Sequence, residues 1–222
     1  MGLNKTKGNM YDFVSHTWNP IKGKCSHDCS YCYMKRWGKL PDLRLDEKEM
    51  KTDLGTGNFI FVGSSTDIFA NDVPDEWIHD VLDYCNGWSN KYLFQTKNPR
   101  RYLDFISYFP EQTVLGTTIE TNRNYDISKA PIPKERAYAM GDLFGYNFER
   151  MVTIEPLMDF DLDDMVTLIR IAMPHWVNIG ADSQKSNLPE PPYYLVKKLI
   201  DALNEFTEVR QKKNLNRLAR GH

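Results

Sequence analysis

The sequence predicts an α/β protein built around a mainly parallel β-sheet. Short apolar runs of strand length alternate six times with amphipathic stretches of helix length, which is typical of βα units. Polar residues also gather directly after five of these runs, where the carboxyl ends of parallel strands usually form a ligand site. The periodicity alone leaves open whether the sheet is open and doubly wound or an incomplete barrel.

The predicted strands are rich in β-branched and aromatic residues, and most of them are bounded by turn residues. The first covers residues 15–19, just ahead of a group of cysteines. The remaining five strands are residues 58–63 (NFIFVG), 91–96 (KYLFQT), 113–118 (TVLGTT), 150–155 (RMVTIE) and 176–180 (WVNIG).

The predicted helices lie between these strands. Residues 74–86 begin with a proline at the first helical position, which suits a helix start, and repeat apolar residues at helical spacing. Residues 161–173 show the same spacing and stop before Pro174. The other three predicted helices are residues 99–108, 133–144 and 191–206.

Composition fits one globular domain. The chain has 222 residues and a net charge of −2. Its overall charge is therefore not that of a protein that binds nucleic acid through a generally basic surface. We expect one domain over residues 1–206 and a basic C-terminal tail over residues 207–222. The apolar runs are too short to span a membrane, and the N-terminus lacks the apolar stretch of a signal peptide, so we expect a cytoplasmic protein.

Three of the four cysteines, Cys25, Cys29 and Cys32, fall within eight residues with the spacing C-x3-C-x2-C. Three thiolates on one loop can bind three irons of a cuboidal cluster and leave the fourth iron open to a small molecule. The alternative is a Cys3His zinc site with His27 or His16 as the fourth ligand. Zinc sites usually pair two C-x2-C units, however, and this chain has a single triplet.

This spacing, with Tyr31 directly before the last cysteine, resembles the signature of the radical S-adenosylmethionine (SAM) superfamily. The resemblance implies a partial (β/α)6 TIM-like barrel, a [4Fe–4S] cluster on the three cysteines, and SAM bound at the open iron. It also implies reductive cleavage of SAM to a 5′-deoxyadenosyl radical, which abstracts hydrogen from a substrate. The required electron would come from an external donor such as flavodoxin or ferredoxin.

Four further motifs are similar to those of the phage Gp37/Gp68 (DUF5131) radical SAM-like family, and the likeness spans roughly residues 15–190. Spore photoproduct lyase is a more distant resemblance, through its cluster loop, and makes a nucleotide or nucleic-acid base a candidate substrate. The sixth strand departs from the family, which commonly has a Gly-Gly-Glu-like end there. The motifs are Thr17-Trp18-Asn19-Pro20, Thr96-Lys97-Asn98-Pro99-Arg100, Ile154-Glu155-Pro156-Leu157 and Trp176-Val177-Asn178-Ile179-Gly180, followed by Ala181-Asp182.

The resemblance implies that SAM contacts follow the strands. Tyr31 would pack on the adenine or shield the cluster from water. Glu120 and Thr121 fall where a ribose contact is expected, although a surface carboxylate is the alternative for Glu120. Asp67 would either bind SAM or lie exposed in a capped turn. The remaining candidate SAM contacts are Gly63, Ser64, Ser65 and Thr66 after the second strand and Gly180 and Asp182 after the sixth.

Lys97 and Glu155 are the charged candidates for substrate or SAM contacts. Glu155 could bind SAM or a substrate, or it could instead pair with a barrel lysine, for which Lys97 is the natural partner. A basic cluster is formed by Lys97, Arg100 and Arg101. It could bind a phosphate-bearing substrate at a helix N-terminus, or it could be the solvated start of a helix. Cys85 lies on the apolar face of a predicted helix, so we expect it to be buried and inert. The basic tail contains Arg210, Lys212, Lys213, Arg217 and Arg220, which suit a solvated end or a nucleic-acid contact.

Two classes of function remain after these observations. The first is a radical SAM enzyme acting on a small molecule, a nucleotide or a nucleic-acid base. The second is a zinc- or cluster-stabilised binding module without turnover.

Overall fold

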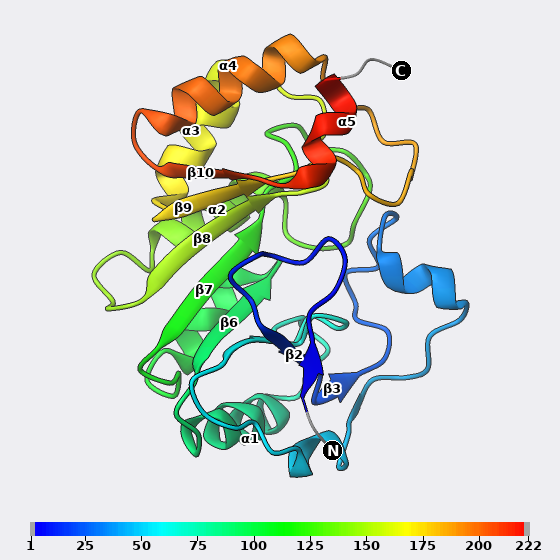
Figure 1. The fold of residues 1–222 in the computed structure, drawn as a ribbon, viewed down its shortest axis with the longest axis vertical. Coiled ribbons are helices and arrows are strands. Elements are labelled where there is room, and N and C mark those ends of the chain that lie inside the picture. Colours follow the sequence, from blue (N-terminus) through cyan, green and yellow to red (C-terminus); the bar gives the residue numbers. More distant parts are fainter. Residues whose placement is uncertain (1–2, 220–222) are drawn as a thin grey trace.

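The computed structural model describes residues 3–219. Eight strands form one sheet in the order β1-β2-β5-β6-β7-β8-β9-β10, and every neighbouring pair except β1–β2 is parallel (Figure 1). The strands are β1 (Asn4–Lys5), β2 (His16–Trp18), β5 (Phe59–Val62), β6 (Lys91–Thr96), β7 (Thr113–Thr118), β8 (Glu149–Ile154), β9 (Trp176–Ile179) and β10 (Glu208–Gln211). Strands β3 (Ile21–Lys22) and β4 (Arg44–Leu45) form a separate antiparallel pair.

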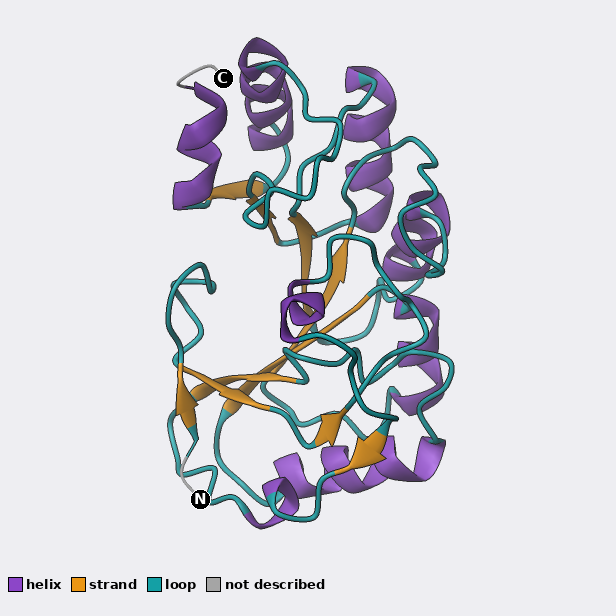
Figure 2. Ribbon diagram, turned by 90° about the vertical axis from the view of Figure 1, so that its right-hand side faces the viewer, coloured by secondary structure: helices purple, strands orange, loops and turns teal. Residues whose placement is uncertain are grey.

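Helices cover one face of this sheet, and the opposite side is open (Figure 2). The α-helices are α1 (Asp75–Asn86), α2 (Pro133–Gly141), α3 (Leu162–Ala172), α4 (Tyr193–Asn204) and α5 (Asn216–Ala219). The 3-10 helices are η1 (Tyr33–Trp37), η2 (Glu49–Lys51), η3 (Pro99–Phe105) and η4 (Lys213–Leu215). The parallel strands and covering helices confirm the predicted α/β class and its partial-barrel form.

The predicted helix over residues 99–108 is instead the shorter 3-10 helix η3. Its Tyr102 is fully buried, and the phenol donates toward the carbonyl oxygens of Phe94 and Gly116 at 2.8 Å each. These contacts fix the segment tightly against β6 and β7. The tertiary contacts therefore override a helical spacing that the sequence shows only weakly.

The two faces of the sheet carry different cores because side chains alternate along each strand. Outward residues such as Phe94, Leu115 and Val152 pack beneath the helices in the larger core. Inward residues form a second core, closed by the N-terminal loop through Tyr11 and Val14. The inward strand residues of this second core are Phe61, Leu93, Val114, Met151 and Trp176.

The inward side chains change from apolar to polar toward the carboxyl ends of the strands. On β6, Leu93 is followed two residues later by Gln95, and on β8 Met151 is followed by Thr153. The phenol of Tyr11 donates to Oε1 of Gln95 at 2.8 Å, so the N-terminal loop meets the sheet where this change occurs. The inward apolar side chains fill the interior of the barrel, and the inward polar side chains at the carboxyl ends of the strands can line a site.

The segment predicted as a basic tail contributes to the sheet. Residues 208–211 form β10, which pairs in parallel with β9. Arg220 lies outside the described residues. Within residues 3–219, no helix combines the length and the apolar character that crossing a membrane requires.

Candidate functional site

A cavity of about 510 Å³ opens at the carboxyl ends of the strands. It joins the cysteine loop, the turn after β5 and the ends of β6 and β8. Of the fifteen site residues predicted from the sequence, twelve line it and three do not. The twelve are Cys25, Cys29, Tyr31, Cys32, Gly63, Ser64, Ser65, Thr66, Asp67, Lys97, Glu155 and Asp182.

The cysteine loop is held by backbone hydrogen bonds to its own turn and to the segment around residue 128. The amide of Cys32 donates to the carbonyl of Cys29 at 3.2 Å, and the amide of Ser30 donates to Ile127 at 2.8 Å. Cys29 is 8% exposed, and its Sγ lies 3.5 Å from Oγ of Ser128. Cys25 and Cys32 are half-buried. All three cysteines therefore line one cavity, on a loop that backbone hydrogen bonds hold in place.

The three thiols around one cavity fit the ligand set of a cuboidal iron–sulfur cluster. Within residues 3–219, no three His, Cys, Asp or Glu side chains converge on one ion. His27 also lines the cavity, and its Nε2 lies 2.9 Å from Oδ2 of Asp67. A cuboidal cluster bonds each thiolate to a different iron, so it needs three thiols around one cavity and not three that converge on a point.

The turn after β5 is shaped to bring backbone close to the cavity. Gly63 has a φ of +76°, and a Cβ there would stand 2.5 Å from Cγ2 of Ile68, so this position requires glycine. Oδ1 of Asn19 accepts hydrogen bonds from the amide of Ser65 at 2.8 Å and from the hydroxyl of Ser64 at 3.1 Å. Asn19 therefore orients both serines, a role that sequence reasoning missed although Asn19 belongs to a motif it had singled out.

Asp67 is not exposed, as one of the two sequence interpretations expected, but partly buried beside the cysteine loop. Its Oδ2 accepts the amide of Lys97 at 2.8 Å, and its Oδ1 accepts the amide of Phe69 at 3.0 Å. Burial alone would raise the pKa of Asp67, but the contact with His27 and the amide of Lys97 hold it below its ordinary value. The carboxylate thus links the cysteine loop to the ends of β5 and β6.

Glu120 is fully buried, which excludes the expected alternative of a surface carboxylate. Its Oε2 accepts a hydrogen bond from Nη1 of Arg136 at 2.8 Å, and its Oε1 accepts the hydroxyl of Tyr31. Burial alone would raise the pKa of Glu120, yet Arg136 and Lys97 hold it below its ordinary value. Burial and the charge of Glu120 raise the pKa of Tyr31 well above its usual range. Tyr31 is therefore a neutral hydrogen-bond donor anchored in the cavity wall.

Lys97 and Glu155 do not pair with each other, which excludes that alternative for Glu155. Nζ of Lys97 lies 4.0 Å from Oε1 of Glu120 and 5.4 Å from the ring centroid of Tyr31. Burial alone would lower the pKa of Lys97, but Cys29 and Glu120 raise it above its ordinary value. Glu155 instead lies 2.6 Å from Nζ of Lys212, because β10 returns the chain to the open side of the barrel.

Glu155 also binds two amides, which no sequence signal indicated. Its Oε1 accepts hydrogen bonds from Nδ2 of Asn9 and Nδ2 of Asn214, each at 2.7 Å. The ammonium of Lys212 in turn donates to the carbonyl of Asn9 at 2.5 Å. The N-terminal loop and the end of β10 are thus fastened together at the carboxyl end of β8.

Three predicted site residues lie outside the cavity. Glu120 and Thr121 line a separate small pocket with residues between 123 and 136, and Oγ1 of Thr121 donates to the carbonyl of Asp159 at 2.7 Å. Gly180 lies behind Glu155, and a Cβ there would stand 2.8 Å from Oε1 of that carboxylate. Asp182 does line the cavity, and its Oδ1 accepts the amide of Gln184 at 2.8 Å.

Comparison with known proteins gives one family and one fold. The model of the family described as "Protein of unknown function (DUF5131)" matches residues 9–202. No curated protein matches the chain.

Solved structures of spore photoproduct lyase have the same fold. A double mutant with bound AdoMet and dinucleoside spore photoproduct is 11% identical, with a TM-score of 0.69, over 94% of this chain and 80% of that chain. A single mutant is 12% identical, with a TM-score of 0.69, over 94% of this chain and 81% of that chain. A third, with dinucleoside spore photoproduct, is 10% identical, with a TM-score of 0.68, over 95% and 81%.

Proposed function

The chain belongs to the DUF5131 family, and from that premise we propose that it is a radical SAM enzyme. One observation carries the proposal. The three cysteines of the C-x3-C-x2-C motif and the glycine-serine turn after β5 line the same cavity at the carboxyl ends of parallel strands. The shared fold of spore photoproduct lyase, whose cluster loop the cysteine motif resembles, supports it.

In this proposal, Cys25, Cys29 and Cys32 hold a [4Fe–4S] cluster. When bound and reduced, such a cluster supplies the electron that splits SAM into methionine and a 5′-deoxyadenosyl radical. The protein's own part is to bind, to orient and to keep water away. Tyr31, buried against the cysteine loop and fixed by Glu120, covers the cluster side of the cavity. Burial of this kind tunes the potential and stability of a cluster.

The turn after β5 is the proposed SAM contact. Gly63 lets the backbone approach closely, while Asn19 fixes the directions of Ser64 and Ser65. Hydroxyl groups and carbonyls of this turn suit the ammonium of the methionine moiety. Asp182, at the opposite wall, is the proposed counterpart for the remaining polar groups of SAM.

Lys97 and Glu155 stand on the strand ends between these walls and are the proposed substrate or SAM contacts. A nucleotide or nucleic-acid base is the proposed substrate class, supported by the dinucleoside that two solved structures of the same fold contain. The electron would come from an external donor such as flavodoxin or ferredoxin. Residues 1–206 are proposed as the enzyme domain, to which β10 adds a further strand.

The test is a SAM-cleavage assay on the whole chain. The protein is reconstituted anaerobically with iron and sulfide, reduced with dithionite, mixed with SAM, and 5′-deoxyadenosine is measured by chromatography. The proposal predicts deoxyadenosine from wild type and none from Cys29→Ala. Iron-loaded wild type that forms no deoxyadenosine would contradict it and leave a metal-stabilised binding module in its place.

A further inference from the structure

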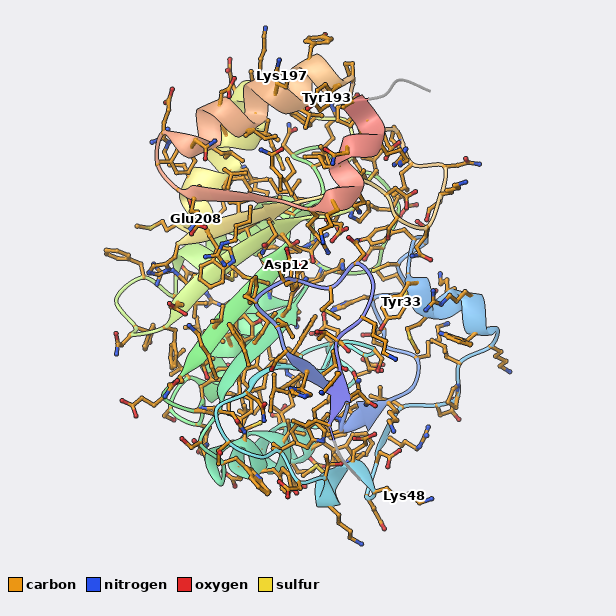
Figure 3. The ribbon with its side chains drawn as sticks, in the orientation of Figure 1. Asp12, Tyr33, Lys48, Tyr193, Lys197 and Glu208 are labelled. Carbon is orange, nitrogen blue, oxygen red and sulfur yellow. The ribbon has the colours of Figure 1, made fainter. Side chains whose placement is uncertain are left out.

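The cavity at the cysteines continues into a second, larger one. The second cavity has a volume of about 740 Å³ and lies between the N-terminal loop and the segment from β10 to α5. Both are lined by residues of the N-terminal loop, including Asn9 and Tyr11, and by Asp182 and Lys212. Figure 3 labels residues on its two sides, Asp12 on the N-terminal loop and Glu208 on β10. The two cavities therefore form one open groove.

The groove is more basic than the protein that contains it. Eight lysines and arginines and five aspartates and glutamates line the two cavities, although the whole chain has a net charge of −2. Most of the carboxylates are engaged, as Glu155 is with Lys212 and Glu208 is with Arg210. Within residues 3–219, four of the lining cations have no carboxylate partner. These are Lys7, Arg36, Lys185 and Lys213.

An aromatic platform stands at the rim of this groove, on η1. Tyr33 and Arg36 line the cavity, and the guanidinium of Arg36 lies 5.6 Å from the ring centroid of Tyr33 and 5.1 Å from that of Trp37. Trp37 is 68% exposed, which is unusual for so large an apolar side chain. The rim thus presents a largely exposed indole beside a cation that contacts two rings but has no carboxylate partner.

We propose that this groove binds single-stranded nucleic acid, with a base stacked on Trp37 and phosphates along the unpaired cations. The inference rests on the proposed function, since it places the reacting nucleotide in the cavity beside the cysteines. Aromatic platforms beside basic grooves bind single strands because every base has a π-face and every linkage a negative charge. A duplex keeps its bases stacked internally and cannot offer one to Trp37 without extruding it.

An acidic electron-donor protein is the other macromolecule that a basic, aromatic surface could attract. Two observations favour the nucleic acid. Tyr33 and Arg36 line the cavity itself, and the exposed Trp37 directly adjoins them in η1. Lys185 and Lys213 continue the positive charge along the second cavity, away from the cysteines.

The test measures binding by fluorescence anisotropy on the full chain. The probes are a fluorescein-labelled oligothymidylate of about 12 nucleotides, an oligouridylate of equal length and a duplex of that length. We expect a single strand to bind more tightly than the duplex, with affinity that falls steeply as salt rises. The deoxy and ribo probes distinguish DNA from RNA as the polymer.

Trp37→Ala is expected to weaken single-strand binding at least about fivefold. Tyr194→Ala is the matched control, because Tyr194 is also exposed and near a lysine but lines neither cavity. A second variant, Lys185→Glu with Lys213→Glu, should lower the affinity and flatten its salt dependence. Unchanged affinity in both groove variants, or no binding by wild type, would overturn the inference.

If Trp37→Ala instead keeps its affinity for single strands and slows only reduction by flavodoxin, the platform serves an electron donor and the inference is wrong. The SAM-cleavage assay distinguishes failure of the proposed function from failure of the groove proposal. Wild type that binds the oligonucleotide but forms no deoxyadenosine contradicts the enzyme and leaves the groove's binding standing. Wild type that cleaves SAM but binds no single strand contradicts the groove alone.

Discussion

Nη1 of Arg136 donates to Oε2 of Glu120 at 2.8 Å, and both side chains are almost fully buried. This ion pair joins α2 to the residues after β7. The same carboxylate accepts the hydroxyl of Tyr31, so the pair also supports the loop that carries the cysteines. A buried ion pair of this kind is costly to break on one side only.

Glu120→Leu is therefore expected to destabilise the protein by about 3–5 kcal/mol, because Arg136 would keep a buried and unpaired charge. The measurement is the free energy of unfolding in urea. Asp142→Asn is the control, since it removes an exposed ion pair with Arg100 of similar length. That control should cost no more than about 1 kcal/mol. Equal losses in the two variants would contradict the structural role of Glu120.

Gly63→Ala tests the turn after β5. The variant combines a left-handed φ of +76° with a Cβ only 2.5 Å from Ile68, so it should lose more stability than backbone strain alone explains. Gly57→Ala isolates the strain, because Gly57 has a φ of +71° and open space around its Cα. Strain alone costs about 1–2 kcal/mol. Thermal melts in which Gly57→Ala is as damaging as Gly63→Ala would show that close packing at the turn does not matter.

Lys212→Met tests the connection across the open side of the barrel. The variant removes the partner of Glu155 and the donor to the carbonyl of Asn9. Hydrogen exchange of residues 8–13 should become faster by an order of magnitude or more, because a hydrogen bond to a charged group contributes about 1.5–3 kcal/mol. Exchange within β6 and β7 serves as the internal control and should not change. Uniform acceleration everywhere would instead indicate global destabilisation.

Asp161 provides a pH test. Hydrogen bonds from Arg123 and Asn122 lower the pKa of Asp161 to about 2. A carboxyl with a lowered pKa stabilises the fold above its unfolded pKa of about 3.9, and this contribution disappears as the pH falls toward 2. The difference in unfolding free energy between wild type and Asp161→Asn should be constant above about pH 5 and shrink below about pH 4. A difference that persists unchanged at pH 2.5 would contradict this assignment.

The sequence predicts the central strands well because their burial leaves a clear pattern. Strands β6 and β7 have the predicted bounds, and β7 is buried at all six of its positions. Strand β10 was missed because Glu208–Gln211 has no apolar run and depends on pairing with β9. The two-residue strands β1, β3 and β4 are too short for any periodicity to appear.

The site residues divide in the same way, into those that the local sequence indicates and those whose contacts depend on distant segments. The cysteines and the turn after β5 lie together in the cavity because one loop and the end of the adjacent parallel strand carry them. The partner of Glu155 could not be predicted, since Lys212 lies 57 residues away and reaches it only through β10. Arg136 was likewise missed, because nothing local marks a helical arginine as the partner of a buried carboxylate.

The proposed cluster on Cys25, Cys29 and Cys32 is tested by the metal content of the reconstituted protein and its cysteine variants. Wild type and Cys85→Ala are compared with Cys25→Ala, Cys29→Ala and Cys32→Ala by iron, sulfide and zinc analysis under anaerobic conditions. Cys85 is fully buried in the helix-side core, away from the cavity, and serves as the matched control. We expect about four irons per chain in wild type and Cys85→Ala and loss of the cluster in the other three. One zinc per chain in wild type, without iron uptake, would contradict it.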